Sequence, residues 1–150
     1  MPAIRLAKRD NRRVNAHFIL YVADQARAAR FYSSVLAKQP RLDVPGMTEF
    51  ELTNGAILGL MPEAGIRRLL GDALPDPAGA RGTPRAELYL VVDDPARFLD
   101  RALAAGATPL SPLIPRDWGH VAGYCLDPDA HVLAFAMADQ ASPHAGQADD

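Results

Sequence analysis

The chain carries an internal repeat whose two copies lie about seventy residues apart. Residues 17–24 (HFILYVAD) return in similar form as residues 87–94 (ELYLVVDD), and each copy runs on into a helical pattern and then into strands. Repeated units bury their apolar faces against each other, so equivalent positions are expected to face one another across a cleft. His17 and Glu87 are equivalent positions, and both side chains can bind a metal ion or a proton.

The first copy predicts a strand, a helix and three further strands. Residues 15–22 alternate as a strand does, and Asp24 supplies a helix N-cap. Strands follow near 41–44, 47–53 and 56–61, the last two joined at Asn54-Gly55, a strong hairpin signal. The helix between Asp24 and Pro40 has its apolar residues at helical spacing, namely Ala28, Phe31, Tyr32, Val35 and Leu36.

The second copy predicts the same order. A strand at 86–92 precedes Asp94-Pro95, an acceptor cap followed by a proline suited to the first helical turn. Strands are expected near 108–110, 120–126 and 131–137, with a turn at 127–130 between the last two. The buried stripe of the second helix is Phe98, Leu99, Ala102 and Leu103.

These patterns predict an α+β fold of two tandem β-α-β-β-β modules that form a cupped mixed sheet with the helices outside. One domain spans 15–138, comprising module one (15–61), a Pro/Gly-rich linker (62–84) and module two (85–138). Within the linker, residues 66–74 are compatible with one short helix. A basic arm (1–14) precedes it and a polar tail (139–150), expected to be disordered, follows. Strand alternation then assigns one set of side chains to the helix side and another to the cleft. The helix side takes Phe18, Leu20, Val22, Leu88, Leu90 and Val92, and the cleft takes His17, Ile19, Tyr21, Glu87, Tyr89 and Val91.

The composition limits the kinds of partner that the protein is expected to bind. A net charge of −2 gives no general attraction to nucleic acid or anionic membranes, and no apolar run is long enough to cross a bilayer. The single cysteine, Cys125, excludes an internal disulfide framework and is expected to be an inert buried residue. We therefore expect a cytoplasmic protein with a small-molecule ligand.

The ordered set of motifs resembles the vicinal oxygen chelate superfamily, which includes glyoxalase I, extradiol dioxygenases and bleomycin resistance proteins. The resemblance covers residues 15–138 and depends on four features. They are His17 ahead of the capping Asp24, the helix start Asp93-Asp94-Pro95, the loop Arg116-Asp117-Trp118-Gly119, and the turn Asp127-Pro128-Asp129-Ala130-His131. It implies the two-module fold and a homodimer, since members commonly pair modules across a two-fold axis.

The resemblance also indicates where metal ligands would stand, on the first and last strands of each copy. His17 and Glu87 occupy the first-strand positions, whereas alignment of the two turns puts Gly59 and Ala134 at the last-strand positions. A catalytic divalent site needs three or more protein ligands, so we expect no cofactor. The alternative is one divalent metal ion held by His17, Glu87 and an unplaced third ligand. Without a metal, His17 and Glu87 are expected to pair with each other.

The remaining candidates favour a binding protein. Trp118, Tyr21 and Tyr89 offer stacking surfaces, and Glu49, Glu51 and Glu87 offer negative charge, so the expected ligand is partly aromatic and cationic. Arg116 is either a clamp for an anionic group or a surface residue, and His120 and His131 are expected to face solvent. No catalytic residue is assigned. The alternatives are a metal-dependent lyase or dioxygenase of the glyoxalase type, and a regulatory dimer with a vestigial cleft.

Overall fold

The computed structural model describes residues 14–140. The basic arm, up to residue 13, and the tail, from residue 141, lie outside this range. Within it, no helix is long and apolar enough to cross a membrane.

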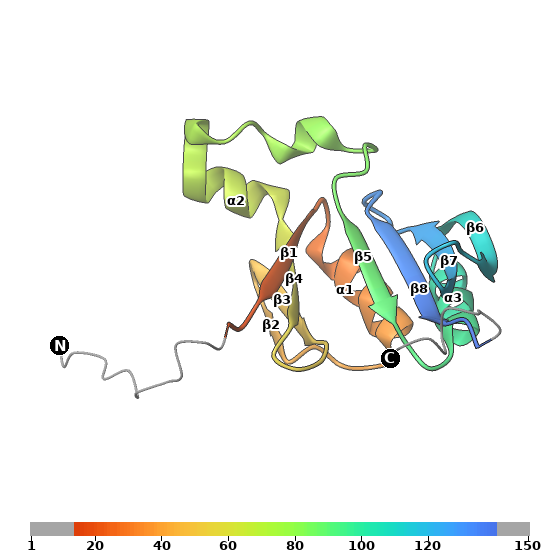
Figure 1. Cartoon of the computed structure of the whole chain (residues 1–150). Helices are drawn as coiled ribbons and strands as arrows, with labels where there is room; N and C mark the ends of the chain where they lie inside the picture. The colour runs from red at the N-terminus through yellow and green to blue at the C-terminus, as the bar shows by residue number, and fades with distance from the viewer. Residues whose placement is uncertain (1–13, 141–150) are drawn as a thin grey trace.

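The strands form two four-stranded mixed sheets, one from each copy of the repeat (Figure 1). The spatial order is β1-β4-β3-β2 in the first sheet and β5-β8-β7-β6 in the second. The opening strand of each module pairs in parallel with its closing strand. The strands are β1 (His17–Val22), β2 (Leu42–Val44), β3 (Met47–Glu51), β4 (Ile57–Pro62), β5 (Glu87–Val91), β6 (Thr108–Pro115), β7 (His120–Leu126) and β8 (Val132–Ala138). The predicted α+β fold and its two modules are confirmed.

Each module has one long helix with the predicted cap. Helix α1 (Gln25–Leu36) starts at Asp24, whose carboxylate accepts the Arg27 N–H at 3.0 Å. That hydrogen bond lowers the pKa of Asp24. Helix α3 (Pro95–Ala104) starts at Asp94, which accepts the Arg97 N–H at 3.2 Å.

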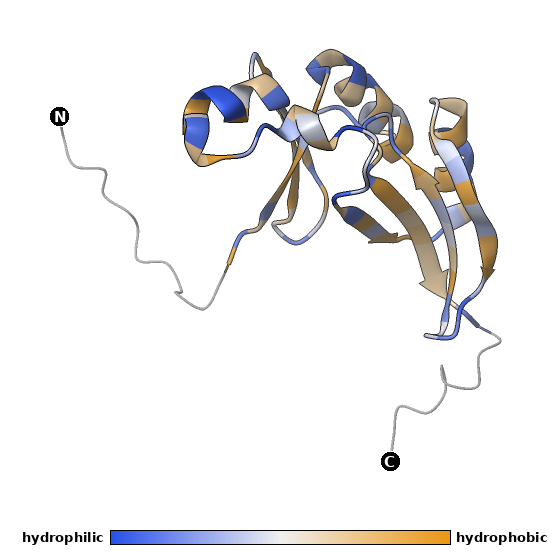
Figure 2. Cartoon of the chain, turned by 90° about the horizontal axis from the view of Figure 1, so that it is seen from above, coloured by the Kyte–Doolittle hydropathy of each residue, from blue (hydrophilic) through white to orange (hydrophobic). Residues whose placement is uncertain are grey.

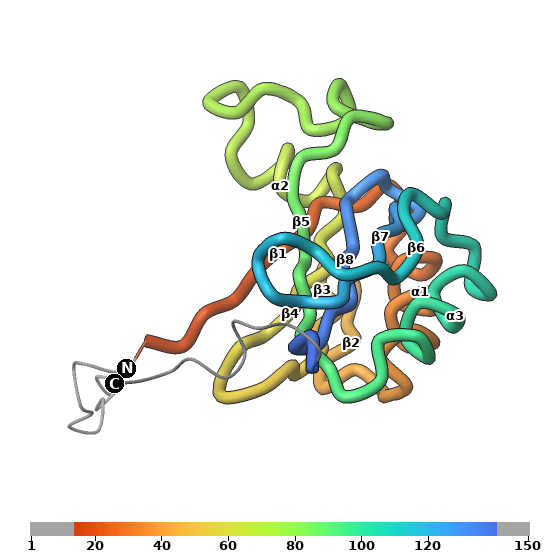
Figure 3. The backbone as a smooth tube through the Cα atoms, turned by 45° about the vertical axis from the view of Figure 1, so that its right-hand side comes forward, coloured from red at the N-terminus to blue at the C-terminus, as the bar shows by residue number. Residues whose placement is uncertain are grey.

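The two helices lie side by side and share one hydrophobic core with the helix-facing sides of both sheets (Figure 3). Leu20 and Leu60 of the first sheet belong to the same core as Leu133 and Phe135 of the second. We call the side of each sheet that faces away from this core its open face. Because the helices lie on the inner side of both sheets, the two open faces point away from each other within one chain. The strands that carry these faces are largely apolar (Figure 2).

Two residues that were predicted to be buried lie outside the core. Leu103, in the predicted stripe of α3, is 37% exposed. Phe18 was expected to pack under α1 with Leu20 and Val22, but its side chain is 59% exposed. It stands near the start of β1, where it lines a groove of about 490 Å³ between β1 and β5. These two strands are each paired on one side only, so each is an edge strand of its sheet.

A buried polar network joins the modules where the turn before β8 meets the β1–α1 junction. The Tyr32 hydroxyl donates to Asp127 Oδ2 at 2.6 Å, and the Ala23 N–H donates to Asp129 Oδ1 at 2.9 Å. His131 Nε2 lies 3.2 Å from the Tyr21 carbonyl oxygen, and the His131 side chain is nearly fully buried. The prediction that His131 faces solvent is wrong, because it lies at this junction.

The linker carries a short helix, α2 (Glu63–Leu70), which starts directly after β4. It begins three residues before the predicted segment. A Cβ on Gly65 would lie 3.5 Å from Met61 Cε, and Met61 belongs to the open face of the first sheet. Helix α2 and α1 therefore lie on opposite sides of that sheet (Figure 1).

Candidate functional site

The open face of the first sheet carries a short chain of charges above an apolar floor. His17 Nδ1 lies 3.5 Å from Glu49 Oε2, and Arg41 donates to Glu49 Oε1 at 2.9 Å. Glu49 is opposite Gly59 in the β3–β4 register, and Ile19 is opposite Gly59 in the β1–β4 register. The predicted cleft residues His17, Glu49 and Glu51, together with Tyr21, thus share one face.

Gly59, at the last-strand ligand position of the first module, has no donor atom and has apolar surroundings. A Cβ there would lie 3.1 Å from Ile19 Cγ1 and 3.2 Å from Met47 Sδ. Apolar side chains therefore crowd the position at which the side chain of a ligand residue would begin.

The open face of the second sheet is aromatic. Tyr89, Ala134 and Tyr124 lie side by side on three adjacent strands, with the fully buried Ala134 between the two tyrosines. Glu87 lies on the same face, two residues before Tyr89. Partial burial raises the pKa of Tyr124, and the negative charge of Glu87 raises it further.

Trp118 completes this face through Tyr89. Its Nε1–H donates to the Tyr89 hydroxyl at 2.9 Å, while its side chain remains 53% exposed. The Tyr89 hydroxyl also lies 2.6 Å from His120 Nδ1, and the rings of Tyr89 and His120 stack with centroids 5.7 Å apart. His120 was expected to face solvent, but it lies half-buried against Tyr89.

Arg116 supports the loop that carries Trp118. Its guanidinium donates to the Ala122 carbonyl at 2.8 Å, to Ser111 Oγ at 2.8 Å and to the Pro112 carbonyl at 3.0 Å. It also lies over the Tyr124 ring at 5.1 Å from the centroid. This geometry favours a structural role for Arg116 over a clamp on an anionic ligand.

The expected pair between His17 and Glu87 does not form within the chain. His17 pairs with Glu49 instead, because His17 and Glu87 lie on open faces that point in different directions. No ion partner of Glu87 is found among residues 14–140.

The donors that one chain supplies within residues 14–140 do not complete the metal centre implied by the resemblance. Neither Gly59 nor Ala134 offers a donor atom, and Glu49 is already paired with Arg41. Within residues 14–140, no three His, Cys, Asp or Glu side chains cluster as metal ligands.

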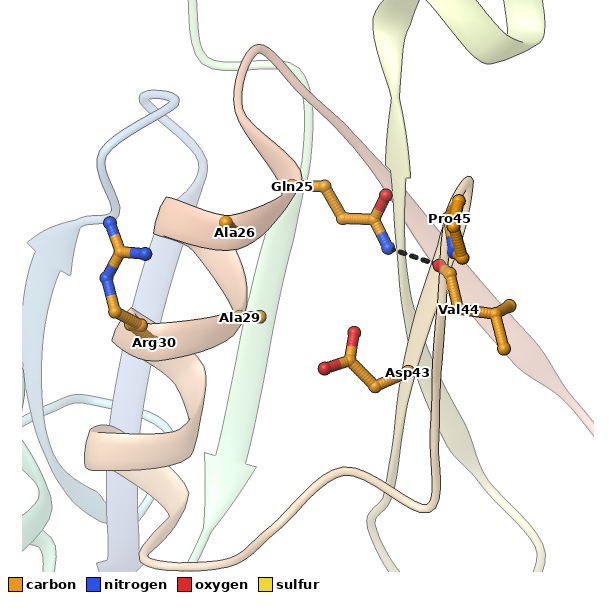
Figure 4. A pocket seen from close by; sticks show the side chains of 7 residues that line it. All are labelled: Gln25, Ala26, Ala29, Arg30, Asp43, Val44 and Pro45. Carbon is orange, nitrogen blue, oxygen red and sulfur yellow. Dashed lines mark hydrogen bonds between the residues drawn. The ribbon is translucent and has the colours of Figure 1, made fainter.

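A larger cavity, of about 530 Å³, lies between α1 and the β2–β3 hairpin, away from both open faces (Figure 4). Gln25 bridges it, donating to the Val44 carbonyl at 2.8 Å and accepting the Gly46 N–H at 2.9 Å. Arg30 points away from Asp43 across the helix (Figure 4). The polar groups here hold the hairpin in place, so the open faces are the better candidate site.

Comparisons with known proteins agree with the fold. The family model "Glyoxalase/Bleomycin resistance protein/Dioxygenase superfamily" matches residues 15–135, and the chain belongs to this superfamily. No curated protein matches the chain.

Solved structures of similar fold include a glyoxalase-related enzyme from Fulvimarina pelagi, with 25% identity and a TM-score of 0.69 over 81% of this chain and 86% of that one. A glyoxalase/bleomycin resistance protein/dioxygenase family enzyme from Burkholderia phytofirmans has 18% identity and a TM-score of 0.69 over 82% and 97%. A glyoxalase/bleomycin resistance protein/dioxygenase from Nocardioides has 20% identity and a TM-score of 0.68 over 90% and 89%. The last two similarities concern the fold alone.

Two interactions were missed by sequence reasoning, one in the site and one in the core. His120 is the partner of Tyr89, and only its place at the start of a strand that follows Trp118 hinted at this. Tyr32 reaches Asp127 across the modules, and its regular place in the apolar stripe of α1 concealed its polar role.

Proposed function

We propose that this protein binds a small, partly aromatic, cationic molecule on its open faces without a resident metal. The observation that carries the proposal is the half-exposed Trp118, whose N–H is held by the hydroxyl of Tyr89. An indole fixed at its N–H and open to solvent is a ready stacking surface for a planar ligand.

The charges near this surface favour a cation. Glu87 lies on the same face as Tyr89 and has no ion partner among residues 14–140. On the other open face, Glu51 is exposed and Glu49 carries a second carboxylate. A planar cation would stack on Trp118 and gain attraction from a carboxylate beside it.

A homodimer would complete the site. In one chain the two open faces point apart, so neither can be closed by the other. A two-fold pair that joins the free edges of β1 and β5 would bring His17 of one chain toward Glu87 of the partner subunit. The exposed apolar side chains along these edges, Phe18, Ile19 and Val91, are suited to such an interface.

The alternative is a metal-dependent lyase or dioxygenase that uses His17, Glu87 and a third ligand. Glu49 is the nearest candidate for that ligand, since its carboxylate lies 3.5 Å from His17. Elemental analysis of protein purified without chelator separates the two. Stoichiometric metal that is lost in the His17→Ala variant would support the enzyme and overturn the metal-free proposal.

Binding is tested by calorimetry with two planar tricyclic probes of opposite charge. Proflavine, a cation, is expected to bind with a micromolar Kd, and 9-anthracenecarboxylate, an anion, at least about tenfold more weakly. Trp118→Ala should weaken proflavine binding at least about tenfold, and Glu87→Gln about threefold. Asp72→Asn removes a fully exposed carboxylate of the linker and is the matched control, with no expected effect. Equal affinity for both probes would contradict the cation preference, and no binding of either would contradict the proposal.

A further inference from the structure

The Tyr89 hydroxyl is hydrogen-bonded on two sides. Trp118 Nε1 lies 2.9 Å from it and His120 Nδ1 lies 2.6 Å from it. An indole N–H can only donate, so the Tyr89 oxygen accepts it. In the neutral tautomer of His120 that carries its ring proton on Nε2, the Tyr89 O–H donates to His120 Nδ1.

This arrangement prepares Tyr89 to act as a base. Donation from Trp118 stabilises negative charge on the phenol oxygen, and His120 is placed to take up the phenol proton. A hydroxyl oxygen has two lone pairs, and Trp118 uses one of them. The second is free to accept a proton from a bound molecule.

The side chain beside Tyr89 on the neighbouring strand is small. Ala134 is directly opposite Tyr89 in the β5–β8 register, at the position where the resemblance puts an acidic ligand. A methyl group there is smaller than a carboxylate and carries no polar atom. Trp118 offers its exposed face to an aromatic ring. Glu87 lies two residues before Tyr89 on the same face of β5.

We infer that Tyr89, with His120 as its proton acceptor, is a general base that removes a proton from a carbon acid, in particular from the carbon between a carbonyl group and a cationic nitrogen of an aromatic ketone. The inference rests on the proposed function, because it uses the same open face for binding. The inference adds metal-independent proton transfer to the proposed binding function.

The step is a reversible proton transfer. The substrate C–H bond breaks, its proton goes to the Tyr89 oxygen, and the Tyr89 O–H proton passes to His120 Nδ1. The electron pair of the C–H bond moves into the enolate. Reversal returns a proton to carbon, and because Tyr89 and His120 are only partly buried, their protons exchange with solvent. The net reaction in heavy water is deuterium incorporation at that carbon, with no other reactant.

The probe is phenacyltrimethylammonium, which has an aromatic ring, a carbonyl and an acidic CH₂ beside a fixed cation. Loss of the CH₂ signal is followed by proton NMR in heavy water, and the Kd is measured separately by calorimetry. The wild type is expected to accelerate exchange over the Tyr89→Phe variant by at least about 100-fold, with Kd values within about threefold of each other.

Two variants separate chemistry from structure. The His120→Gln side chain can accept the Tyr89 hydrogen bond but cannot take up its proton, so binding is retained and exchange falls at least about 100-fold. Trp118→Phe keeps a stacking ring and removes the N–H, so exchange falls about tenfold. Asp72→Asn removes a fully exposed carboxylate of the linker and is the control that keeps the wild-type rate.

The combined outcomes of binding and exchange separate the proton transfer from the proposed function. Probe binding with a wild-type exchange rate equal to that of Tyr89→Phe overturns the proton transfer and leaves the proposed function intact. Exchange that depends on Tyr89 and His120, measured as a second-order rate, supports the proton transfer even where calorimetry detects no binding. If the probe does not bind and shows no enzyme-dependent exchange, both the proton transfer and the proposed function are overturned.

Discussion

The Tyr32 hydroxyl donates to Asp127 Oδ2 at 2.6 Å, and this hydrogen bond joins the helix of the first module to the last turn of the second. Both side chains are buried. Burial and the adjacent Asp127 carboxylate raise the pKa of Tyr32 well above its ordinary value, so the phenol remains protonated and keeps donating. This hydrogen bond lies in the core between the two sheets, and the open faces lie on the far sides of those sheets.

Removal of this hydroxyl is expected to destabilise the whole domain. In Tyr32→Phe, Asp127 keeps the N–H donors of Asp129 and His131 on Oδ1 but loses its donor on Oδ2. A buried acceptor without a donor costs about 1–3 kcal/mol. Urea unfolding should show that loss for Tyr32→Phe and less than about 0.5 kcal/mol for Tyr124→Phe, whose ring is only partly buried. Equal losses would contradict the role of the hydrogen bond.

Asp127 also gives the protein a pH dependence of known sign. Burial raises the pKa of Asp127 above its ordinary value of 3.8, against the lowering effect of the Tyr32 hydrogen bond. The folded state therefore retains a proton that the unfolded state releases, and the stability from this group is present below pH 3.8 and lost as pH rises through the folded pKa. The stability of the wild type relative to Asp127→Asn should accordingly decrease as pH rises from about 3 to 7. The urea midpoints of both proteins are measured across this pH range. If the stability of the wild type relative to Asp127→Asn increased with pH, the prediction would be contradicted.

Local patterns predicted the elements well, because caps and periodicity act within a few residues. Asp24, Asp94 and the Asn54-Gly55 turn stand where the structure uses them. Strand β6 (Thr108–Pro115) is longer than predicted, since three prolines discourage a strand prediction, yet an edge strand tolerates them.

The features that could not be predicted depend on contacts between residues that are far apart in the sequence. The repeat indicates that His17 and Glu87 are equivalent, but not that the helices pack together on the inner side and turn the two residues apart. Similarly, strand alternation assigns Phe18 to the helix side, but it cannot show that α1 leaves this end of β1 uncovered. The partner of His17, Glu49, comes from a cross-strand register that only the folded sheet defines.

The two glycines of the sheet interiors should respond differently to an added methyl group. A Cβ on Gly123 would lie 2.9 Å from Leu99 Cδ2 and 3.3 Å from the Leu113 backbone nitrogen, inside the core under α3. A Cβ on Gly59 would meet only side-chain atoms, those of Ile19 and Met47, on an open face where both can move. Gly123→Ala should therefore cost about 1–3 kcal/mol and Gly59→Ala less than half as much, as measured by urea unfolding. A larger cost at Gly59 would show that the open face is rigidly packed.

The proposed dimer predicts that a charge on the β1 edge produces monomers. Phe18 is 59% exposed, so Phe18→Asp removes little from the core of one chain but puts a charge into the proposed interface. Sedimentation should show dimers for the wild type and monomers for Phe18→Asp, with unfolding of the variant at lower denaturant. Leu69→Asp, at a 70% exposed position of α2, is the control and should remain dimeric. A wild type that is monomeric at high micromolar concentration would contradict the shared site.

Subunit mixing tests whether each binding site takes one open face from each chain. Glu51→Lys reverses a charge on the first face and Trp118→Ala removes the stacking surface of the second, so each variant alone should bind proflavine at least about tenfold more weakly. If the sites are shared, a mixed dimer contains one site with both changes and one with neither. Equal mixing after dissociation and reassociation should then restore about a quarter of the wild-type sites, because about half of the dimers are mixed and each has one intact site of two. If each site lies within a single chain, every chain carries one change and calorimetry of the mixture recovers no wild-type sites.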